Sequence, residues 1–197
     1  MNLLLFGVNH KTAPVALRER LASLIPEVGE VYRQLQDCPE FSELLLYATC
    51  NRVEVVCVTE APEQAAARLQ AFFAQDPEVA GSLKDAAYVR LDQDAVLHLF
   101  RVAASLDAMV VGEPQILGQV KAAYREATGH NATGAILNRL VHKAFSVAKR
   151  VRRETGIGDH AVSVSYAAIT LGKKIFGSLE GKNVLLLGAG EMAELAL

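Results

Sequence analysis

Cys50 stands where a side chain could act as a nucleophile. It belongs to the segment 49–52, which interrupts two apolar runs at residues 44–48 and 53–58. Both runs are predicted to be strands, and the short interruption makes them antiparallel neighbours. A cysteine at a strand end is held firmly yet stays open to a substrate, and a nearby guanidinium such as that of Arg52 favours the reactive thiolate. The alternative interpretation is a turn cysteine beside a solvated arginine.

The other two cysteines are predicted to be inert. Cys57 alternates onto the same strand face as Val53 and Val55, which is typical of a buried thiol. Cys38 precedes Pro39 in a loop, and no neighbour in the sequence would activate it. Three cysteines without metal-ligand spacing indicate neither a disulfide framework nor a metal site.

His98 is the second candidate for chemistry. It lies in a helical pattern at residues 92–106, for which Asp92 is the expected N-cap. The apolar stripe of this helix leaves His98 on the opposite side, together with Asp94 and Arg101. One interpretation is an exposed or half-buried polar face. The other is a proton carrier or carbonyl polariser that works near neutral pH.

A third group of polar residues surrounds the start of the next predicted helix, residues 115–127. Glu113 and Pro114 precede the helix, and Gln115 begins it. Gln119 follows Gln115 at i+4, so both amides share one helix face and can bind a polar substrate if that face opens on a pocket. Without a pocket, the segment is an ordinary helix entry.

A glycine-rich segment near the end of the sequence indicates a dinucleotide site. It follows an apolar run at residues 184–187, predicted to be a buried strand, and it opens a helix. Such glycines let the backbone approach a pyrophosphate at the helix N-terminus. The residue that reads the ribose lies about 20 positions further on, beyond Leu197, so NAD and NADP are not distinguished. The predicted phosphate loop consists of Gly188, Ala189, Gly190, Glu191, Met192 and Ala193.

The elements that must position these residues alternate between strand and helix in the first half of the sequence. Besides the two strands around Cys50, the pattern predicts strands at 3–8 and 88–91 and helices at 14–22, 27–36 and 61–74. The order β-α-α-β-β-α-β favours an α+β fold of the ferredoxin-like, split βαβ type.

The second half is predicted to be helical until the glycine-rich segment. Helices are expected at 92–106, 115–127, 135–155 and 163–176, with a linker at 156–159. We expect residues 1–156 to form one domain with a helical subdomain, and residues 157–197 to be a linker helix and the truncated start of a Rossmann-type α/β domain.

Composition narrows the class of protein. The 197 residues are 51% hydrophobic, and 20 basic against 22 acidic side chains give a net charge of −2. This balance excludes general disorder and a generally basic nucleic-acid binder, so any phosphate contact must come from a local patch such as the basic residues of 149–153. No apolar run approaches the ~20 residues of a membrane span, and no signal peptide is evident. We expect a soluble, cytoplasmic protein.

Five motifs together resemble the glutamyl-tRNA reductase family: GVNHKTAP at 7–14, TCNRVE at 49–54, HLFRVA at 98–103, VGEPQILGQV at 111–120 and GAGEM at 188–192. The resemblance covers the whole chain. It implies NADPH-dependent reduction of glutamyl-tRNA to glutamate-1-semialdehyde through a cysteine thioester, the first step of five-carbon porphyrin (tetrapyrrole) biosynthesis. It also implies a homodimer through a C-terminal domain that the chain lacks, and a downstream aminomutase as a partner.

The resemblance implies roles for individual residues. Cys50 would be the nucleophile, His98 would be important for activity, and residues 188–193 would hold NADPH. Substrate contacts would come from Thr49, Cys50, Asn51, Arg52, Ala108, Glu113, Pro114, Gln115 and Gln119. Ala108 replaces a family serine that contacts substrate, which puts one hydrogen bond in doubt, typically about 0.5–1.5 kcal/mol.

Two alternatives remain at the level of sequence. A shikimate-type dehydrogenase would share a nucleotide-binding domain but leaves the segment 49–52 unexplained. A non-catalytic tRNA-binding or regulatory module would keep the fold without the reaction, and an intact Cys50 argues against it.

Overall fold

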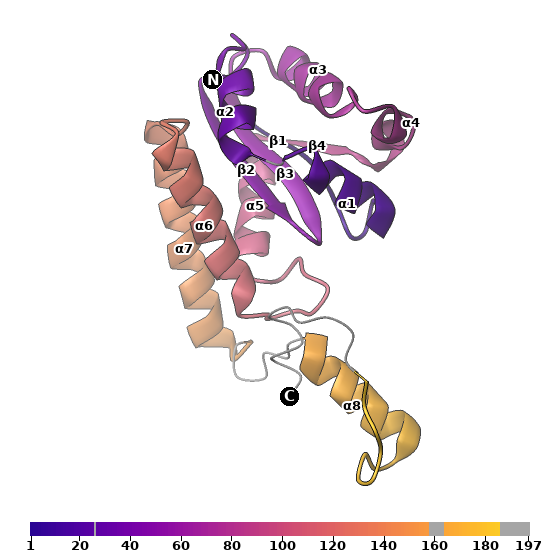
Figure 1. The fold of residues 1–197 in the computed structure, drawn as a ribbon. Coiled ribbons are helices and arrows are strands. Elements are labelled where there is room, and N and C mark those ends of the chain that lie inside the picture. Colours follow the sequence, from indigo (N-terminus) through magenta and orange to yellow (C-terminus); the bar gives the residue numbers. More distant parts are fainter. Residues whose placement is uncertain (26, 158–163, 186–197) are drawn as a thin grey trace.

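A four-stranded antiparallel sheet is the centre of the molecule (Figure 1). The computed structural model describes residues 1–25, 27–157 and 164–185. The strands are β1 (Asn2–Asn9), β2 (Glu43–Thr49), β3 (Arg52–Thr59) and β4 (Tyr88–Leu91), in the spatial order β2-β3-β1-β4. Every neighbouring pair is antiparallel.

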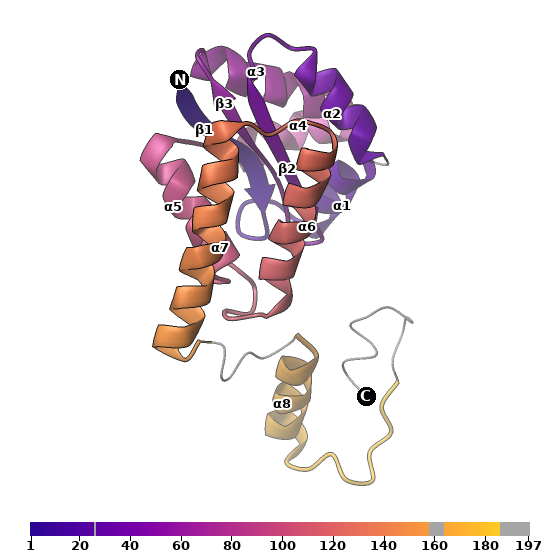
Figure 2. The same cartoon turned by 90° about the vertical axis from the view of Figure 1, so that its left-hand side faces the viewer.

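Helices cover both faces of this sheet (Figures 1 and 2). One face carries α5 (Asp92–Ala103), α6 (Gln115–Gly129) and α7 (Ala135–Thr155); the other carries α1 (Val15–Ser23), α3 (Pro62–Phe73) and α4 (Pro77–Ala86). Because both faces are covered, β3 is buried along its whole length and β1 along most of it. This explains why the two central strands are almost continuously apolar in sequence.

The β2 edge of the sheet is closed by side-chain and loop contacts rather than by another strand. Helix α2 (Val28–Gln36) places the Tyr32 hydroxyl 2.9 Å from the backbone N–H of Leu46, and the Ala132 carbonyl accepts from the N–H of Leu44. On the same strand, the carboxylate of Glu43 accepts from the N–H groups of Ile136 and Leu137 at the start of α7. These bonds satisfy edge donors and a helix N-terminus together.

The structure agrees with the expected element order but corrects three details. A helix that was not predicted, α4, follows Asp76, whose side chain accepts from the N–H of Glu78 while Pro77 occupies the first helical position. Asp92 is not an N-cap: it has a φ of 45°, and its side chain accepts from Asn2 and Leu3 of β1. Helix α5 ends at Ala103 rather than at residue 106, shortly before Ser105 with its φ of 61°.

The last described segment differs from its predicted form. After α8 (Val164–Phe176), Val184 and Leu185 are irregular and 73% and 82% exposed, although a buried strand was expected at 184–187. A buried strand needs paired neighbours and a cover, and among the described residues nothing supplies them here. Residues 186–187 and the predicted phosphate loop 188–193 lie outside the described residues. None of the described helices has the length and apolar character needed to cross a membrane.

Gly7 of β1 lies between β3 and β4, where its missing side chain leaves room for the side chain of Glu54. In the register of the sheet it lies opposite Glu54 on β3 and opposite Tyr88 on β4. A Cβ atom at Gly7 would come within 2.6 Å of the Val53 carbonyl oxygen and 2.7 Å of the Glu54 Cγ. The absence of a side chain therefore lets the Glu54 side chain lie across β1.

We predict that Gly7→Ala destabilises the fold, because the added methyl meets backbone atoms on β3 that cannot move independently. Overpacking of this kind typically costs about 1–3 kcal/mol. Urea unfolding followed by circular dichroism measures the effect. Gly81→Ala, at a helical position of α4 with nothing within 4 Å, is the matched control and should stabilise the protein by about 0.4–1 kcal/mol. Equal midpoints for the two variants would contradict the close approach at Gly7.

Candidate active site

The turn between β2 and β3 presents Cys50 to solvent. Cys50 is exposed, and the N–H of Asn51 donates to the Thr49 hydroxyl at 3.2 Å. From α1, Nη1 of Arg18 donates to the Cys50 carbonyl at 2.6 Å and to Oδ1 of Asn51 at 3.1 Å. The thiol is thus carried by a tight turn whose backbone is held by a buried guanidinium.

Cys50 borders a cavity of about 320 Å³ between β2, α2 and α6. Thr49 and Gln119 also line it, so the structure brings together three of the predicted site residues. The remaining lining residues are mostly apolar: Val28, Leu46, Ala48, Ala122, Ala123 and Glu126. An apolar wall with a few polar groups and one thiol at its rim suits a small polar acyl group.

Arg52 does not face the thiol as its position in the sequence suggested. Its side chain is only 3% exposed; Nη1 lies 2.8 Å from Oε1 of Glu54, and Nη2 donates to the Asp107 carbonyl. Burial would lower the pKa of Arg52, but the charge of Glu54 and smaller contributions from Tyr88, Tyr47 and Asp107 together keep that pKa above its ordinary value. The guanidinium that contacts the Cys50 turn therefore belongs to Arg18, which sequence reasoning missed.

Glu54 is the centre of a buried polar cluster beneath the turn. One of its carboxylate oxygens, Oε1, accepts hydrogen bonds from Arg52, from the Tyr88 hydroxyl and from Nε2 of His98. Burial by itself would raise the pKa of Glu54, but the hydrogen bond from His98 and the charge of Arg52 hold it below its ordinary range. The ionised carboxylate is thus stabilised inside the protein.

His98 lies inside this cluster and not on a solvated face, which corrects one of the two sequence interpretations. It is 4% exposed, with Nε2 2.7 Å from Glu54 and Nδ1 3.7 Å from Asp107. The Tyr88 ring meets it edge-on at 5.6 Å between centroids. The side of α5 that carries His98 is buried because it covers the carboxylate of Glu54, which lies opposite Gly7 in the sheet. Among the described residues, those lining the Cys50 cavity do not include His98.

The loop between α5 and α6 closes the cluster from the side. Asp107 forms an ion pair with Lys11. Burial would raise the pKa of Asp107, but the hydrogen bond from Lys11 and the charges of Arg52 and Lys11 together hold it below its ordinary value. The Ser105 hydroxyl donates to the Glu113 carbonyl at 2.7 Å. Arg152 of α7 donates to the same carbonyl at 2.7 Å and to the Ser105 hydroxyl at 3.1 Å. Arg152 therefore holds this loop and does not belong to an exposed basic patch.

The other predicted substrate residues lie around the same loop. Ala108 packs against the small cluster formed by Tyr47, Val102, Ile116 and Val120. Glu113 is buried, which raises the pKa of its carboxyl. Pro114 is the exposed N-cap residue of α6, and Gln115 begins the helix half-buried.

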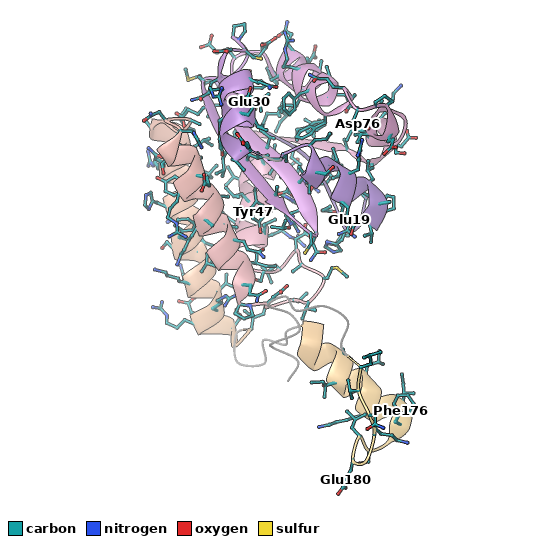
Figure 3. All side chains as sticks on the ribbon, viewed as in Figure 1. Glu19, Glu30, Tyr47, Asp76, Phe176 and Glu180 are labelled. Carbon is teal, nitrogen blue, oxygen red and sulfur yellow. The ribbon has the colours of Figure 1, made fainter. Side chains whose placement is uncertain are left out.

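Tyr47 connects this region to the Cys50 cavity, where the sheet meets α6 (Figure 3). Its hydroxyl lies 3.4 Å from Oε1 of Gln119, a cavity residue. Burial raises the pKa of Tyr47, so the phenol stays protonated and can donate.

Several residues of the site were not predicted from sequence. They share one feature, a charged or polar side chain inside an apolar element or directly after one: Arg18, Tyr47, Glu54, Tyr88 and Asp107. A carboxylate at residue 54, in the middle of a strand that is otherwise apolar, is the signal that could have revealed the cluster, because buried charges require partners.

Comparisons with known proteins agree on one family. The family described as glutamyl-tRNAGlu reductase, N-terminal domain, matches residues 6–155. The glutamyl-tRNA reductase of Desulfatibacillum aliphaticivorans is 52% identical over 198 residues, and that of Syntrophus aciditrophicus is 54% identical over 199. Each alignment covers 100% of this chain and 46% or 47% of the relative.

A solved structure is similar as well. The glutamyl-tRNA reductase from Methanopyrus kandleri has a TM-score of 0.68 and 36% identity, over 98% of this chain and 45% of that one. The chain thus spans about half the length of the relatives it matches. These matches do not favour the shikimate-type dehydrogenase or the non-catalytic module.

We predict that Glu54→Gln destabilises the fold by about 3–5 kcal/mol at neutral pH, because it leaves Arg52 buried without its counter-charge. The pKa of Glu54 is lower in the folded protein, so its stabilising contribution is present above the ordinary value of 4.5 and is lost as the pH falls below it. Urea midpoints measured from pH 7 to pH 3 should therefore fall less steeply in the variant.

Glu30→Gln is the matched control, since Glu30 pairs with Arg33 on the exposed surface of α2 (Figure 3). Its midpoints should follow those of the unsubstituted protein. If Glu54→Gln behaves like this control, the buried carboxylate is not ionised and the cluster is misinterpreted.

Proposed function

This chain belongs to the glutamyl-tRNA reductase family, and from that premise we propose that it supplies the part that binds glutamyl-tRNA and forms the thioester. The proposed reaction of the complete protein is NADPH-dependent reduction of glutamyl-tRNA to glutamate-1-semialdehyde, the first step of porphyrin biosynthesis. The observation that carries the proposal is the exposed thiol of Cys50 at the rim of a cavity that also contains Thr49 and Gln119.

The chemistry begins with the thiolate of Cys50. Its sulfur attacks the carbonyl carbon of the glutamyl ester, a C–S bond forms, and the ester C–O bond breaks. The electron pair of that bond goes to the ribose oxygen, which takes up a proton as the tRNA leaves. The product is a thioester, whose carbonyl is a far better electrophile for hydride than a free carboxylate.

The neutral polar groups around Cys50 are suited to hold the glutamyl group. The side-chain oxygen Oδ1 of Asn51 accepts a hydrogen bond from Arg18. The side-chain N–H groups of Asn51 therefore point away from Arg18. We propose that these donors, the Thr49 hydroxyl and the Gln119 amide bind the polar atoms of the glutamyl group. Gln115, one helical turn before Gln119, together with Glu113, Pro114 and Ala108, would border the same substrate from the loop side.

We assign Arg52 and His98 to the floor of the site. Arg52 is engaged by Glu54 and Asp107, so it orients the strand end beneath the turn rather than pairing with a substrate carboxylate. His98 acts through Glu54 and is a positioning residue in this proposal. Its role as a proton carrier stays a prediction.

NADPH would supply the hydride for the second half-reaction. Its predicted loop, residues 188–193, lies outside the described residues, whereas the residues proposed for acylation lie within them. We also propose the ferredoxin-like assignment, which the strand order β2-β3-β1-β4 supports, and the domain division at residues 156 and 157. The Rossmann-type second domain, the homodimer, an aminomutase partner and a cytoplasmic location are further parts of the same proposal.

We predict that incubation with glutamyl-tRNA adds one glutamyl group to Cys50, because its thiol is exposed at the cavity, and that Cys50→Ser removes this thioester adduct. Intact-protein mass spectrometry followed by peptide mapping detects it. Cys57→Ser is the matched control: Cys57 is buried, and burial raises the pKa of its thiol to about 12, so the adduct should persist in that variant. An unmodified chain, or an adduct that survives in Cys50→Ser, would rule out the covalent mechanism at this residue.

A further inference from the structure

Arg18 is an unusual residue for its position on α1. Helix α1 packs against β3 and α4. Arg18 is nevertheless only 6% exposed, although arginine side chains normally keep their charge in water. A buried guanidinium requires hydrogen-bond partners, and the identity of those partners indicates what it does.

The partners of Arg18 lie on two separate loops. Nε donates to the Ala13 carbonyl at 3.3 Å, within the loop that joins β1 to α1. Nη1 donates to the Cys50 carbonyl at 2.6 Å and to Oδ1 of Asn51 at 3.1 Å. One planar group therefore fixes the backbone that carries the thiol and the side chain beside it relative to the end of the central strand.

The bonds that Arg18 makes among the described residues go to neutral oxygens. Arg52, by contrast, is paired with the carboxylate of Glu54, and Arg20 with that of Asp76. The charge of Arg18 is therefore not neutralised by a carboxylate bonded to it in the described part of the chain. The Nη1 atom of Arg18, which carries part of that charge, lies 2.6 Å from the carbonyl oxygen of Cys50.

We propose that Arg18 is a positioning residue for the nucleophile: it holds the 49–52 turn so that the Cys50 sulfur approaches the ester carbonyl carbon at the angle that addition requires, and it supplies positive charge beside that turn. This inference rests on the proposed function, because it concerns the acylation step. A misplacement of about 1 Å at a reacting atom can cost about 10²-fold in rate.

The test compares single-turnover acylation of Cys50 in the unsubstituted chain and in Arg18→Gln and Arg18→Lys, over a range of glutamyl-tRNA concentrations. Arg18→Gln keeps one donor but loses the charge, and Arg18→Lys keeps the charge but loses the planar pair of donors. We expect Arg18→Gln to lower the saturating acylation rate by about 10²-fold and Arg18→Lys to recover it to within about tenfold of the unsubstituted chain. The half-saturating concentration should change little in either variant.

Arg20→Gln is the matched control, because Arg20 lies on the same helix but is half-exposed and pairs with Asp76 and Glu78. It should keep the full saturating rate. Melting temperatures of all variants separate a loss of fold from a loss of positioning. If Arg18→Gln unfolds, Arg18→Lys decides: with intact folding, a saturating rate within about tenfold of that of the unsubstituted chain supports the inference, and a fall of about 10²-fold overturns it.

The inference is overturned if folded Arg18→Gln acylates at the unsubstituted rate, if its defect appears only in the half-saturating concentration, or if folded Arg18→Lys recovers nothing. An unsubstituted chain that stays unacylated overturns the proposed function, and this inference with it. The two failures are thus distinguished by the unsubstituted chain alone.

Discussion

The burial of one carboxylate, that of Glu54, determines how the rest of the site is arranged. An ionised carboxylate in the middle of a covered sheet is tolerated only with close partners, and Arg52, Tyr88 and His98 all converge on one of its oxygens. The Glu54 side chain passes Gly7 of β1, where a Cβ atom would come within 2.7 Å of the Glu54 Cγ. The strand register, the absence of a side chain at residue 7 and the packing of α5 against β1 together meet the requirement for close partners.

The two arginines near the thiol, Arg18 and Arg52, make different contacts. Arg52 adjoins Cys50 in sequence but turns inward to Glu54, whereas Arg18 is 32 residues away and contacts the turn directly. Alternation along β3 explains this, since Arg52 shares a strand face with Glu54. The site therefore has two parts. The charge-paired cluster around Glu54 lies beneath the turn, and Arg18 holds the turn that carries Cys50 beside a cavity with mostly apolar walls.

The sequence alone predicted the elements better than the faces on which their polar residues lie. Short apolar runs located the strands, and helix periodicity located α7 at 135–155 with the bounds observed. Helix α4 was not predicted, because an Asp–Pro pair after the helix predicted at 61–74 is typical of a helix end, whereas Asp76 and Pro77 begin a new helix here. Two interpretations of His98 stayed open because periodicity places it opposite the apolar stripe but does not distinguish water from a buried carboxylate on that side of the helix. Arg18 could not be predicted, since its contacts depend on how α1 packs beside β3.

Charge balance explains why residues so far apart in sequence belong together. Lys11 and Arg52 supply two positive charges, Glu54 and Asp107 supply two negative ones, and the His98 ring lies between both carboxylates. Removing Glu54 leaves the charge of Arg52 buried without its counter-charge, which costs more than the lost contact itself. The β1 end, the start of β3, α5 and the loop before α6 are therefore energetically coupled. Arg152 extends the coupling to α7, because it holds the loop that brings Asp107 into the cluster.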